Sequence, residues 1–555
     1  MEARKACLKK ILNSNVQIIV PIFQREYSWR EEQIKTLWED TLKLYNRIEE
    51  TRNIEITHFL GPIVRTGTAN SIVDTSKSFI IDGQQRLITL MILLACIRNK
   101  LNEINEPLAK KTENMYLLNA DEDNESKFKL LPSEVDRENF KKIMLGENDL
   151  IESKITNTYN FFSEELATKT DIEIEKLRNI LVQNLMFVNI AVNSSENPYL
   201  IFESLNAKGT PLTQSDLIRN YIFMKIPEED KQKELYKKYW SPMEKSLGNK
   251  LQYFFWNYSK MDGNFVKWEK TYSNMKGVLE AKNEREVENE LKKFFKFSRY
   301  SSCIINPENE ENEEIKKRLQ RHNRWEIGTA HPFLLNIYKG FEENKITVQQ
   351  FCKILDIIES FVIRRFFCGW KTNKLNTLFI HLYNKIDKLN FISSMEEILI
   401  PDWPDNSLFV EGFKTYHIYR SGTNKSRLVL ESLEDSFNHK EPVDYDYEKI
   451  QIEHIMPQVQ GNPESLSELW KKMLGSNYTQ IYSKYLHTIG NLTLTGYNPE
   501  ASKKPFEDKK IIYGHSHFEM NKYFDEVYLW NEEEIERIAQ NMANIAIDLW
   551  DYPEK

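Results

Sequence analysis

The 555-residue sequence has few cysteines and no cysteine pattern that binds a metal or builds a disulfide framework. No C-x-x-C pair occurs, which argues against a zinc ribbon and a disulfide-stapled fold. The five cysteines are Cys7, Cys96, Cys303, Cys352 and Cys368. No run of about 18 uncharged apolar residues occurs, and residues 1–10 are polar and basic, without the apolar core of a signal peptide. We therefore expect a cytoplasmic protein without a membrane span.

The chain also lacks an excess of basic residues, a Walker A loop and internal repeats. Its formal net charge is -8, so it is not a generally basic nucleic-acid coat, and any DNA-binding surface must be local. The pattern G-x-x-x-x-G-K-[ST] is absent, which excludes a P-loop nucleotide site. With 41% hydrophobic residues, the chain can build substantial cores, and its length predicts two to four domains of about 150 residues each.

Two segments near the C-terminal end contain the residues of a hydrolytic site. The sequences Q-I-E-H-I-M-P and H-T-I-G-N-L-T-L-T-G-Y-N predict a strand, an excursion, a second strand and the start of a helix. His454 is the natural base for water, because imidazole titrates near pH ~6.5. Glu453 and Asn498 offer the oxygen ligands that Mg²⁺ prefers, and Asn491 can hold the loop that carries His454. In the alternative, these residues only end a strand and form turns.

This set resembles the ββα-metal nuclease motif, also called HNH or His-Me finger, with its acid-His pair, x-x-Pro and two later asparagines. The sequence departs from it in having Glu453 instead of aspartate and a predicted extra helix, residues 466–474, inside the motif. The resemblance implies hydrolysis of phosphodiesters with Mg²⁺ or Mn²⁺. It makes His454, Asn491 and Lys509 catalytic, with Lys509 on a predicted helix, residues 499–513.

A second motif, D-G-Q-Q-R, lies near the N-terminus between a predicted strand, residues 78–81, and a strongly apolar predicted helix, residues 87–101. The unpaired backbone N–H groups and the dipole at a helix start favour an anion such as phosphate. Arg86 would add bidentate hydrogen bonds, and Asp82 could hold a metal or a ribose hydroxyl. In the alternative, this turn only caps the helix.

Together, the N-terminal blocks and the nuclease motif resemble the GmrSD-type, modification-dependent (type IV) restriction endonucleases. The N-terminal blocks are P-I-F-Q-R-E-Y-S-W, D-G-Q-Q-R and the segment from I-F-E-S-L-N-A-K-G-T-P-L to D-L-I-R-N. The resemblance implies a ParB/sulfiredoxin-like domain that binds and hydrolyses a nucleoside triphosphate (NTP). The nucleotide-binding residues are then Gln24, Arg25, Asp82, Gly83, Gln84, Gln85, Arg86, Asn206, Lys208 and Arg219.

Local basic segments are the candidates for DNA phosphate contacts, which are salt dependent but blind to sequence. Residues 361–374 contain no acid, and a lysine-rich helix follows the nuclease motif. The predicted DNA-binding residues are Arg364, Arg365, Lys371, Lys503 and Lys504. A solvated face without a ligand is the alternative for each segment. The aromatic residues 253–258 are expected to lie in a core, with stacking on a flipped base as the alternative.

The sequence thus predicts an α+β, multidomain protein. Its expected domains are a ParB-like nucleotide-handling domain (1–225), a helical domain (226–404) and a ββα-metal nuclease domain (405–555). By resemblance, it would cleave modified phage DNA, for example DNA with glucosylated hydroxymethylcytosine, in NTP-regulated antiviral defence, and a homodimer is one expected state. The alternatives are a toxin-like nuclease acting on host nucleic acid and a DNA-binding nucleotide switch with an inactive nuclease half.

Overall fold

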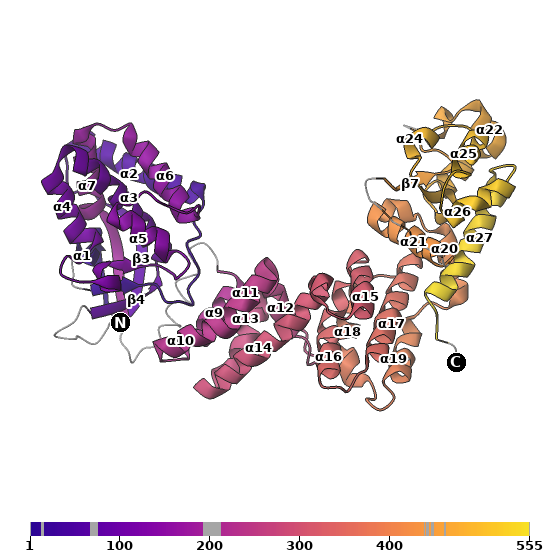
Figure 1. The fold of residues 1–555 in the computed structure, drawn as a ribbon, viewed down its shortest axis with the longest axis horizontal. Helices are drawn as coiled ribbons and strands as arrows, with labels where there is room; N and C mark the ends of the chain where they lie inside the picture. The colour runs from indigo at the N-terminus through magenta and orange to yellow at the C-terminus, as the bar shows by residue number, and fades with distance from the viewer. Residues whose placement is uncertain are drawn as a thin grey trace. The chain divides into compact units, whose positions relative to one another are not determined.

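The structure is a computed structural model that describes most of the chain. The described residues are 2–12, 16–66, 76–192, 212–437, 439, 443, 445, 449–459 and 462–553. These residues form two compact units (Figure 1). The first comprises Met1–Lys245 and Tyr272–Lys293, and the second Ser246–Thr271 and Phe294–Lys555. The predicted α+β, multidomain fold class is confirmed; the predicted boundaries of three domains stay a prediction.

The first unit is built on a mixed, six-stranded sheet within the described residues, in the order β1-β6-β3-β4-β2-β5. β1 pairs antiparallel with β6, β6 parallel with β3, and β3 antiparallel with β4, while β2 pairs parallel with both β4 and β5. The strands are β1 (Glu2–Cys7), β2 (Val16–Ile19), β3 (His58–Thr66), β4 (Ser76–Asp82), β5 (Leu130–Leu131) and β6 (Leu185–Val192).

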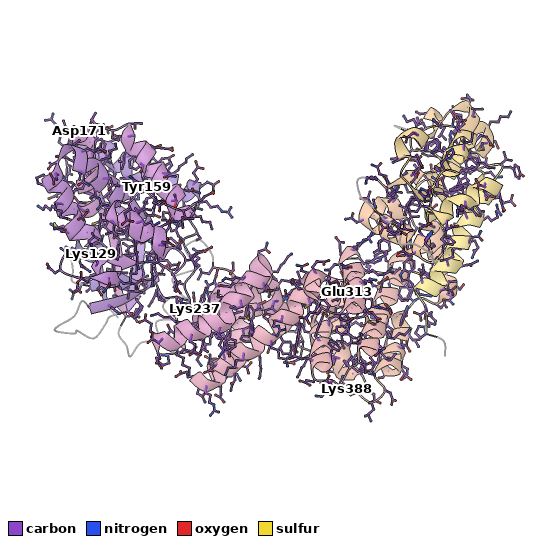
Figure 2. The ribbon with its side chains drawn as sticks, viewed as in Figure 1. Lys129, Tyr159, Asp171, Lys237, Glu313 and Lys388 are labelled. Atoms are coloured by element: carbon purple, nitrogen blue, oxygen red, sulfur yellow. The ribbon has the colours of Figure 1, made fainter. Side chains whose placement is uncertain are left out.

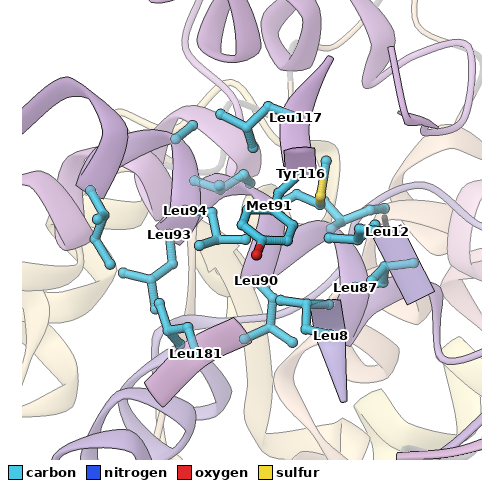
Figure 3. Packing of buried hydrophobic residues seen from close by; sticks show 14 of the residues in the cluster. Leu8, Leu12, Leu87, Leu90, Met91, Leu93, Leu94, Tyr116, Leu117 and Leu181 are labelled. Carbon is cyan, nitrogen blue, oxygen red and sulfur yellow. The ribbon is translucent and has the colours of Figure 1, made fainter. Parts of the chain in front are cut away.

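Helix α3 (Gln84–Ile104) is the centre of this unit, because its residues 87–97 are apolar except for Thr89, and a helical segment of that kind must be buried on all sides. Figure 3 shows its residues Leu87, Leu90, Met91 and Leu94 packed among buried residues of other elements. The other helices are α1 (Leu8–Leu12), α2 (Glu31–Thr51), α4 (Glu106–Thr112), α5 (Arg137–Leu145), α6 (Lys154–Ala167), α7 (Asp171–Gln183), α9 (Gln214–Met224) and α10 (Glu229–Leu235).

Three helices contain residues of both units: α11 (Ser241–Leu247), α13 (Thr271–Glu280) and α14 (Glu284–Ile305). The second unit is otherwise helical around one short hairpin, β7 (Gln451–His454) and β8 (Leu492–Thr495). Its helices are α12 (Leu251–Tyr258), α15 (Glu313–Arg324), α16 (His331–Glu342), α17 (Val348–Phe367), α18 (Asn373–Lys385), α19 (Phe391–Leu399), α20 (Asn406–Thr415), α21 (Thr423–Asp435), α22 (Glu468–Leu474), α23 (Tyr478–Tyr485), α24 (Asn498–Ala501), α25 (Phe506–Tyr513), α26 (Glu519–Lys522) and α27 (Glu532–Leu549).

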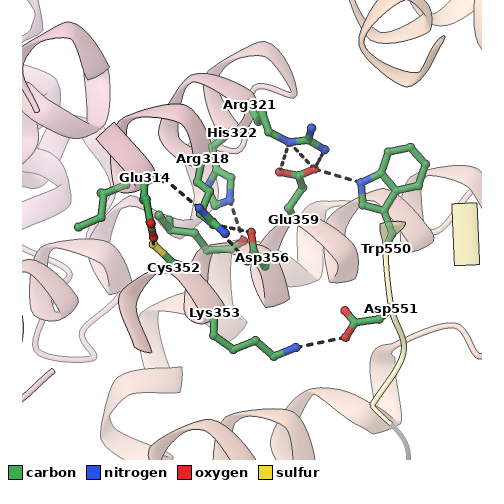
Figure 4. Close-up of polar contacts among 12 residues, drawn as sticks. Glu314, Arg318, Arg321, His322, Cys352, Lys353, Asp356, Glu359, Trp550 and Asp551 are labelled. Atoms are coloured by element: carbon green, nitrogen blue, oxygen red, sulfur yellow. Dashed lines mark hydrogen bonds and ion pairs between the residues drawn. The ribbon is translucent and has the colours of Figure 1, made fainter. Parts of the chain in front are cut away.

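Polar contacts fix the end of α27 and the residues after it to α17 (Figure 4). The buried Glu359 carboxylate accepts a hydrogen bond from Trp550 Nε1 at 3.0 Å and forms an ion pair with Arg321 at 2.5 Å. Lys353 pairs with Asp551 at 3.1 Å. A buried carboxylate is stable only when it is paired and hydrogen-bonded, so these contacts tie the last helix of the nuclease region to the helical region.

Charged side chains also cover the surface of the protein. Lys237, Glu313 and Lys388 are exposed examples (Figure 2).

The aromatic group at 253–258 is mainly part of the core, as predicted. Phe254 and Phe255 are fully buried, and Phe255 packs edge-on against Phe294 at 5.4 Å between ring centroids. Tyr253 and Trp256 are partly exposed. Within the described ranges, no helix is both long and apolar enough to cross a membrane.

Candidate functional site

The C-terminal site is built on the β7–β8 hairpin. Glu453 pairs with Thr493 and His454 with Leu492 in an antiparallel register. Because strand side chains alternate between faces, Gln451 and Glu453 leave β7 on one face and His454 leaves on the other. The predicted base and the predicted metal ligand are thus adjacent in sequence but project from opposite faces of the strand.

His454 lies in a buried aromatic environment, with 7% of its surface exposed. Its Nε2 lies 3.3 Å from Nδ1 of His487, and the ring of Tyr419 meets it edge-on at 4.5 Å. Burial, and then the neighbouring His487 and Lys509, lower the pKa of His454 to about 3. The imidazole is therefore neutral at neutral pH, which is the form that a general base requires.

Asn491 fixes the chain just after His454. Its Oδ1 accepts a hydrogen bond from Met456 N at 2.7 Å, and its Nδ2 donates to Met456 O at 3.1 Å and to Leu486 O at 3.0 Å. Trp530 Nε1 also donates to Oδ1, at 3.2 Å. The fully buried Asn491 thus performs the loop-holding role that the sequence predicted, and it does not face solvent.

Glu453 and Lys509 form a buried ion pair. Lys509 Nζ lies 2.6 Å from Glu453 Oε1 and donates a second hydrogen bond to His454 O at 2.7 Å. Burial raises the pKa of Glu453 and lowers the pKa of Lys509, and the opposite charge of each partner acts against that shift. Lys509 is 0% exposed. It therefore supports the end of β7 from inside the fold, whereas the resemblance implied a catalytic role.

The oxygen donors beside this ion pair suit a hard divalent cation in type. Asn498, at the first position of α24, donates from Nδ2 to Gln451 Oε1 at 2.9 Å, so its amide lies on the face of β7 that also carries Glu453. The buried Tyr513 hydroxyl has no hydrogen-bond partner among the described residues, and burial, together with the nearby Glu453 charge, raises its pKa. A carboxylate, amide oxygens and an unsatisfied hydroxyl fit Mg²⁺, which keeps several waters. Lys509 would compete with the ion for Glu453.

The helices around the motif differ from the sequence predictions in their boundaries. The extra helix predicted at 466–474 is followed by a second helix, α23, inside the same gap. The helix predicted at 499–513 is two helices, α24 and α25, because the chain turns at Ser502, whose φ is +27°. This turn lets Lys509 reach back to Glu453, whereas Lys503 and Lys504 remain exposed.

Two residues of the site were outside the predicted set. His487 begins the second segment of the nuclease motif without a role in the prediction, and Tyr419 lies 35 positions before His454 with no motif around it. Tyr419 belongs to the short 3-10 helix η10 (Ile418–Ser421), and its ring stacks on His487 at 5.6 Å with an interplanar angle of 7°. Only the folded chain brings η10 beside β7.

Gly490 sets how closely the Asn491 segment approaches α27. A Cβ atom at Gly490 would lie 2.5 Å from Ile535 O and 3.0 Å from Ala539 Cβ. We expect Gly490→Ala to lower the free energy of unfolding by about 1–3 kcal/mol, the usual cost of overpacking. Gly496→Ala is the matched control, because a Cβ there meets nothing closer than 3.7 Å. Chemical denaturation of both variants tests this, and equal stabilities would contradict the close approach.

The N-terminal motif lies where strand β4 meets helix α3, as the sequence predicted. Gly83 is the N-cap of α3 with φ +94°, and a Cβ there would lie 3.1 Å from Pro62 O. Glycine is therefore required by both conformation and space. Asp82 and Arg86 lie on the same side of this turn, because Arg86 Nη2 is 3.5 Å from Asp82 Oδ2.

The glutamines of this motif hold the preceding segment of the chain. Gln84 Nε2 donates to Arg25 O at 3.2 Å. Gln85 accepts a hydrogen bond from Ser28 N at 2.7 Å and donates to Glu26 O at 3.1 Å. Both glutamines are buried, as is Gln24, whose Nε2 donates to Ile81 O at 3.4 Å. Their visible contacts are structural, in contrast to the predicted contacts with a nucleotide, although Gln84 Oε1 has no partner among the described residues.

Charged groups gather around the start of α3. Burial lowers the pKa of Arg25, and the carboxylates of Asp216 and Asp82 oppose that shift. Burial likewise lowers the pKa of Arg86, whose Nη1 donates to Leu60 O at 2.6 Å. Arg25 and Arg86 are only half-buried, so their guanidinium groups are the ones placed to meet an anion.

Arg219 is buried and already paired with acids. Its guanidinium bonds to Asp216 at 2.8 Å and to Glu244. Burial alone would lower the pKa of Arg219, but these two carboxylates raise it above its usual value. Thr213 and Asp216 form a capping box at the start of α9. Asn206 and Lys208, predicted to bind the nucleotide, lie outside the described residues.

A cavity of about 430 Å³ adjoins this turn along strand β4. Its walls are mainly apolar and include Phe23, Phe79, Ile81 and Met224, while Gln232 adds a polar group. A cavity of this size and polarity suits a flat, largely apolar ring with one or two polar edges.

Two of the predicted DNA-binding residues have a structural role. Arg364 is 0% exposed and donates to Trp550 O at 2.5 Å and to Pro404 O at 3.3 Å. Arg365 is also buried and donates to Asp402 O at 2.7 Å. Because these guanidinium groups are used inside the fold, they do not meet a phosphate, contrary to the prediction. Lys371, Lys503 and Lys504 are exposed, as a DNA contact would require.

The chain matches two family models, one at each end. Residues 8–223 match the model described as GmrSD restriction endonuclease, N-terminal domain. Residues 403–545 match the model described as GmrSD restriction endonucleases, C-terminal domain. A comparison with curated proteins found no match. The first match contains the Asp82–Arg86 turn, and the second contains the β7–β8 hairpin.

Proposed function

Because the chain belongs to the GmrSD restriction endonuclease family, we propose that it cleaves modified phage DNA with a divalent cation, under the control of an NTP. The observation that carries the nuclease assignment is the hairpin site, where a neutral His454 ends β7 and Asn491 holds the next turn from both its N–H and its C=O side. That arrangement presents a base on a fixed backbone, which phosphodiester hydrolysis requires.

In this proposal His454 accepts a proton from the attacking water. The low pKa of the buried imidazole makes it a weak base in the free protein, and a DNA phosphate beside the ring would raise that pKa by its negative charge. Asn491 keeps the base in place. Lys503 and Lys504 are exposed after α24, and in this proposal they contact the DNA backbone.

Glu453 and Asn498 would hold Mg²⁺ or Mn²⁺ on the other face of β7. When bound, such an ion supplies positive charge for the phosphate and the leaving oxygen. Lys509 neutralises Glu453 while no ion is bound, because it lies 2.6 Å from the carboxylate. The buried ion pair thus holds the Glu453 carboxylate on the face of β7 where the Asn498 amide contacts Gln451.

We also propose that the turn from Asp82 to Arg86 handles the nucleotide. Its support is the helix start at Gly83, with the half-buried Arg25 and Arg86 close by, which suits a phosphate chain. The adjoining cavity of about 430 Å³ offers room for the base. In this proposal, the nucleotide binds to the first unit and controls DNA cleavage by a cytoplasmic defence enzyme. The proposed homodimer stays a prediction.

The experiment that tests this function is a cleavage assay on matched DNA substrates. Unmodified, hydroxymethylated and glucosylated phage DNA, host DNA and host RNA are each incubated with the protein and Mg²⁺, with and without each NTP, and both cutting and phosphate release are followed. We expect cutting of a modified DNA and a change of rate with one NTP. Equal cutting of unmodified host DNA or RNA would favour the toxin-like nuclease, and nucleotide hydrolysis with no cutting of any substrate would favour the nucleotide switch.

For the nucleotide site, we expect Asp82→Asn to lower NTP hydrolysis at least about tenfold, because the loss of one charged, positioned group typically costs roughly 10- to 10⁴-fold. Asp171→Asn is the matched control. It changes an exposed aspartate at the start of α7 in the same unit. Release of phosphate from each NTP is the measurement. Hydrolysis that is equal in Asp82→Asn and wild type would place the nucleotide site elsewhere.

A further inference from the structure

The predicted base has a second histidine as its buried neighbour. His454 Nε2 and His487 Nδ1 lie 3.3 Å apart, within hydrogen-bonding distance for two imidazole rings. Both histidines are nine-tenths buried. His487 comes from the segment between α23 and η12 (Ile489–Asn491), so the contact joins the two halves of the nuclease motif.

The direction of this hydrogen bond decides whether His454 can act as a base. A neutral imidazole carries one N–H group and one basic nitrogen. If His487 donates, Nε2 of His454 accepts that hydrogen bond and the single proton of the His454 ring lies on Nδ1. The His454 ring then has no free basic nitrogen to take a proton from water. If His454 donates from Nε2, its Nδ1 is the basic atom. Only the second arrangement allows His454 to take a proton.

We propose that His487 is a positioning residue that accepts a hydrogen bond from His454 and thereby makes His454 Nδ1 the basic atom of the nuclease site. This inference rests on the proposed nuclease function and goes beyond it by naming the residue that sets the tautomer of the base. A neighbouring group that accepts from one ring nitrogen fixes the state of the other.

Tyr419 holds both rings in the required positions. Its ring is parallel to His487, at 5.6 Å and 7°, and meets His454 edge-on at 4.5 Å and 76°. Its backbone N donates to His487 O at 3.3 Å. Such aromatic contacts favour offset and edge-on geometries, so Tyr419 of η10 restrains both rings.

The surroundings of His487 keep it neutral and thus able to accept. Burial lowers the pKa of His487, and the neighbouring Arg420 and His417 lower it further. The titratable groups that face the two rings include His417, Tyr419 and Arg420 from the η10 segment and Lys509 from α25. An imidazolium at His487 would have no basic Nδ1, so the burial of the ring beside the Arg420 guanidinium favours the accepting form.

A pair of substitutions separates positioning from packing. His487→Asn should retain the acceptor, because the new side chain would place an amide oxygen near the position of Nδ1, whereas His487→Leu removes it. We expect His487→Leu to lower kcat by ~10–100-fold, the usual cost of losing the partner that orients a histidine, with little change in KM. We expect His487→Asn to retain at least about a third of wild-type kcat. Equal loss in both variants would overturn the proposal.

The tautomer is measured directly by ¹⁵N NMR of the full chain labelled on histidine, with the His454 signals identified by their loss in His454→Gln. We expect a protonated Nε2 and an unprotonated Nδ1 in the wild type, and a mixture of tautomers in His487→Leu. A proton on Nδ1 of wild-type His454 would overturn the proposal. This readout needs no substrate. If the wild type cuts no DNA, the proposed function fails and the tautomer still decides the role of His487, including when His487→Leu does not fold.

Discussion

Replacement of His454 by alanine is expected to lower DNA cleavage by ~10²–10⁴-fold, the contribution of a positioned general base. The physical reason is that the neutral imidazole at the end of β7 is the group on this face of the hairpin placed to remove a proton from water. DNA binding should change little, because only a neutral ring is lost. The free energy of unfolding should fall by roughly 2–5 kcal/mol, because the buried ring packs against Tyr419 and His487 and its removal leaves a cavity. Single-turnover cleavage of the best DNA substrate measures the effect.

His517→Ala is the matched control for this variant. His517 belongs to the same region and is exposed, so its loss should leave cleavage unchanged. A gel-shift assay with the same DNA shows whether His454→Ala still binds. Cleavage by His454→Ala at the wild-type rate would remove His454 from the proposed mechanism and leave the ββα arrangement as a structural feature.

The second large effect is expected on stability, at the buried ion pair. Lys509→Met removes the ammonium group and leaves the Glu453 carboxylate buried without its partner. Lys509 Nζ lies 2.6 Å from Glu453 Oε1, and Lys509 is fully buried. Breaking a buried pair in this way typically costs ~3–5 kcal/mol of unfolding free energy. Adding Glu453→Gln removes the unpaired charge, so the double variant should recover most of that loss. Urea denaturation of the wild type, both single variants and the double variant completes the cycle.

The loss in Lys509→Met should grow as the pH rises. Burial raises the pKa of Glu453 above its ordinary value of 4.5, and removal of Lys509 takes away the charge that opposes this shift. The folded state then binds more protons than the unfolded state, so the free energy of unfolding falls as pH rises from about 4.5 toward the raised pKa. The difference from wild type should therefore be smallest in acid. A difference that is independent of pH would show that Glu453 is not the group left unpaired.

The ion pair also affects the role of the cation. If Mg²⁺ binds at Glu453, it must compete with the Lys509 ammonium, which already satisfies one carboxylate oxygen. Stabilisation of the wild type by Mg²⁺ would then be smaller than that of Lys509→Met, in which the carboxylate has no competing cation. The denaturation cycle above, repeated with the metal, makes this comparison.

The sequence by itself determined the elements that carry the two sites. The apolar segment after D-G-Q-Q-R was correctly predicted to be a helix, with the turn at Gly83 between it and the preceding strand. The two segments around His454 and Asn491 were correctly predicted to form two strands and a helix start, which are β7, β8 and α24, and the side chain of Asn491 was correctly expected to hold the loop that carries His454. These predictions succeed because they depend on local geometry, in which neighbours along the chain decide the outcome.

What only the tertiary structure decided is which charges are buried and with which partners. Arg364 and Arg365 are indistinguishable in sequence from a basic DNA-binding surface, yet their donors are used by the backbone of the C-terminal segment and the 402–404 turn. Lys509 is in a lysine-rich helix, yet it is the one of four nearby lysines that reaches Glu453, because the chain turns at Ser502. Tyr419 meets His454 from 35 positions away. Long-range packing sets the desolvation and pairing of each such group, and residue type and spacing do not contain that information.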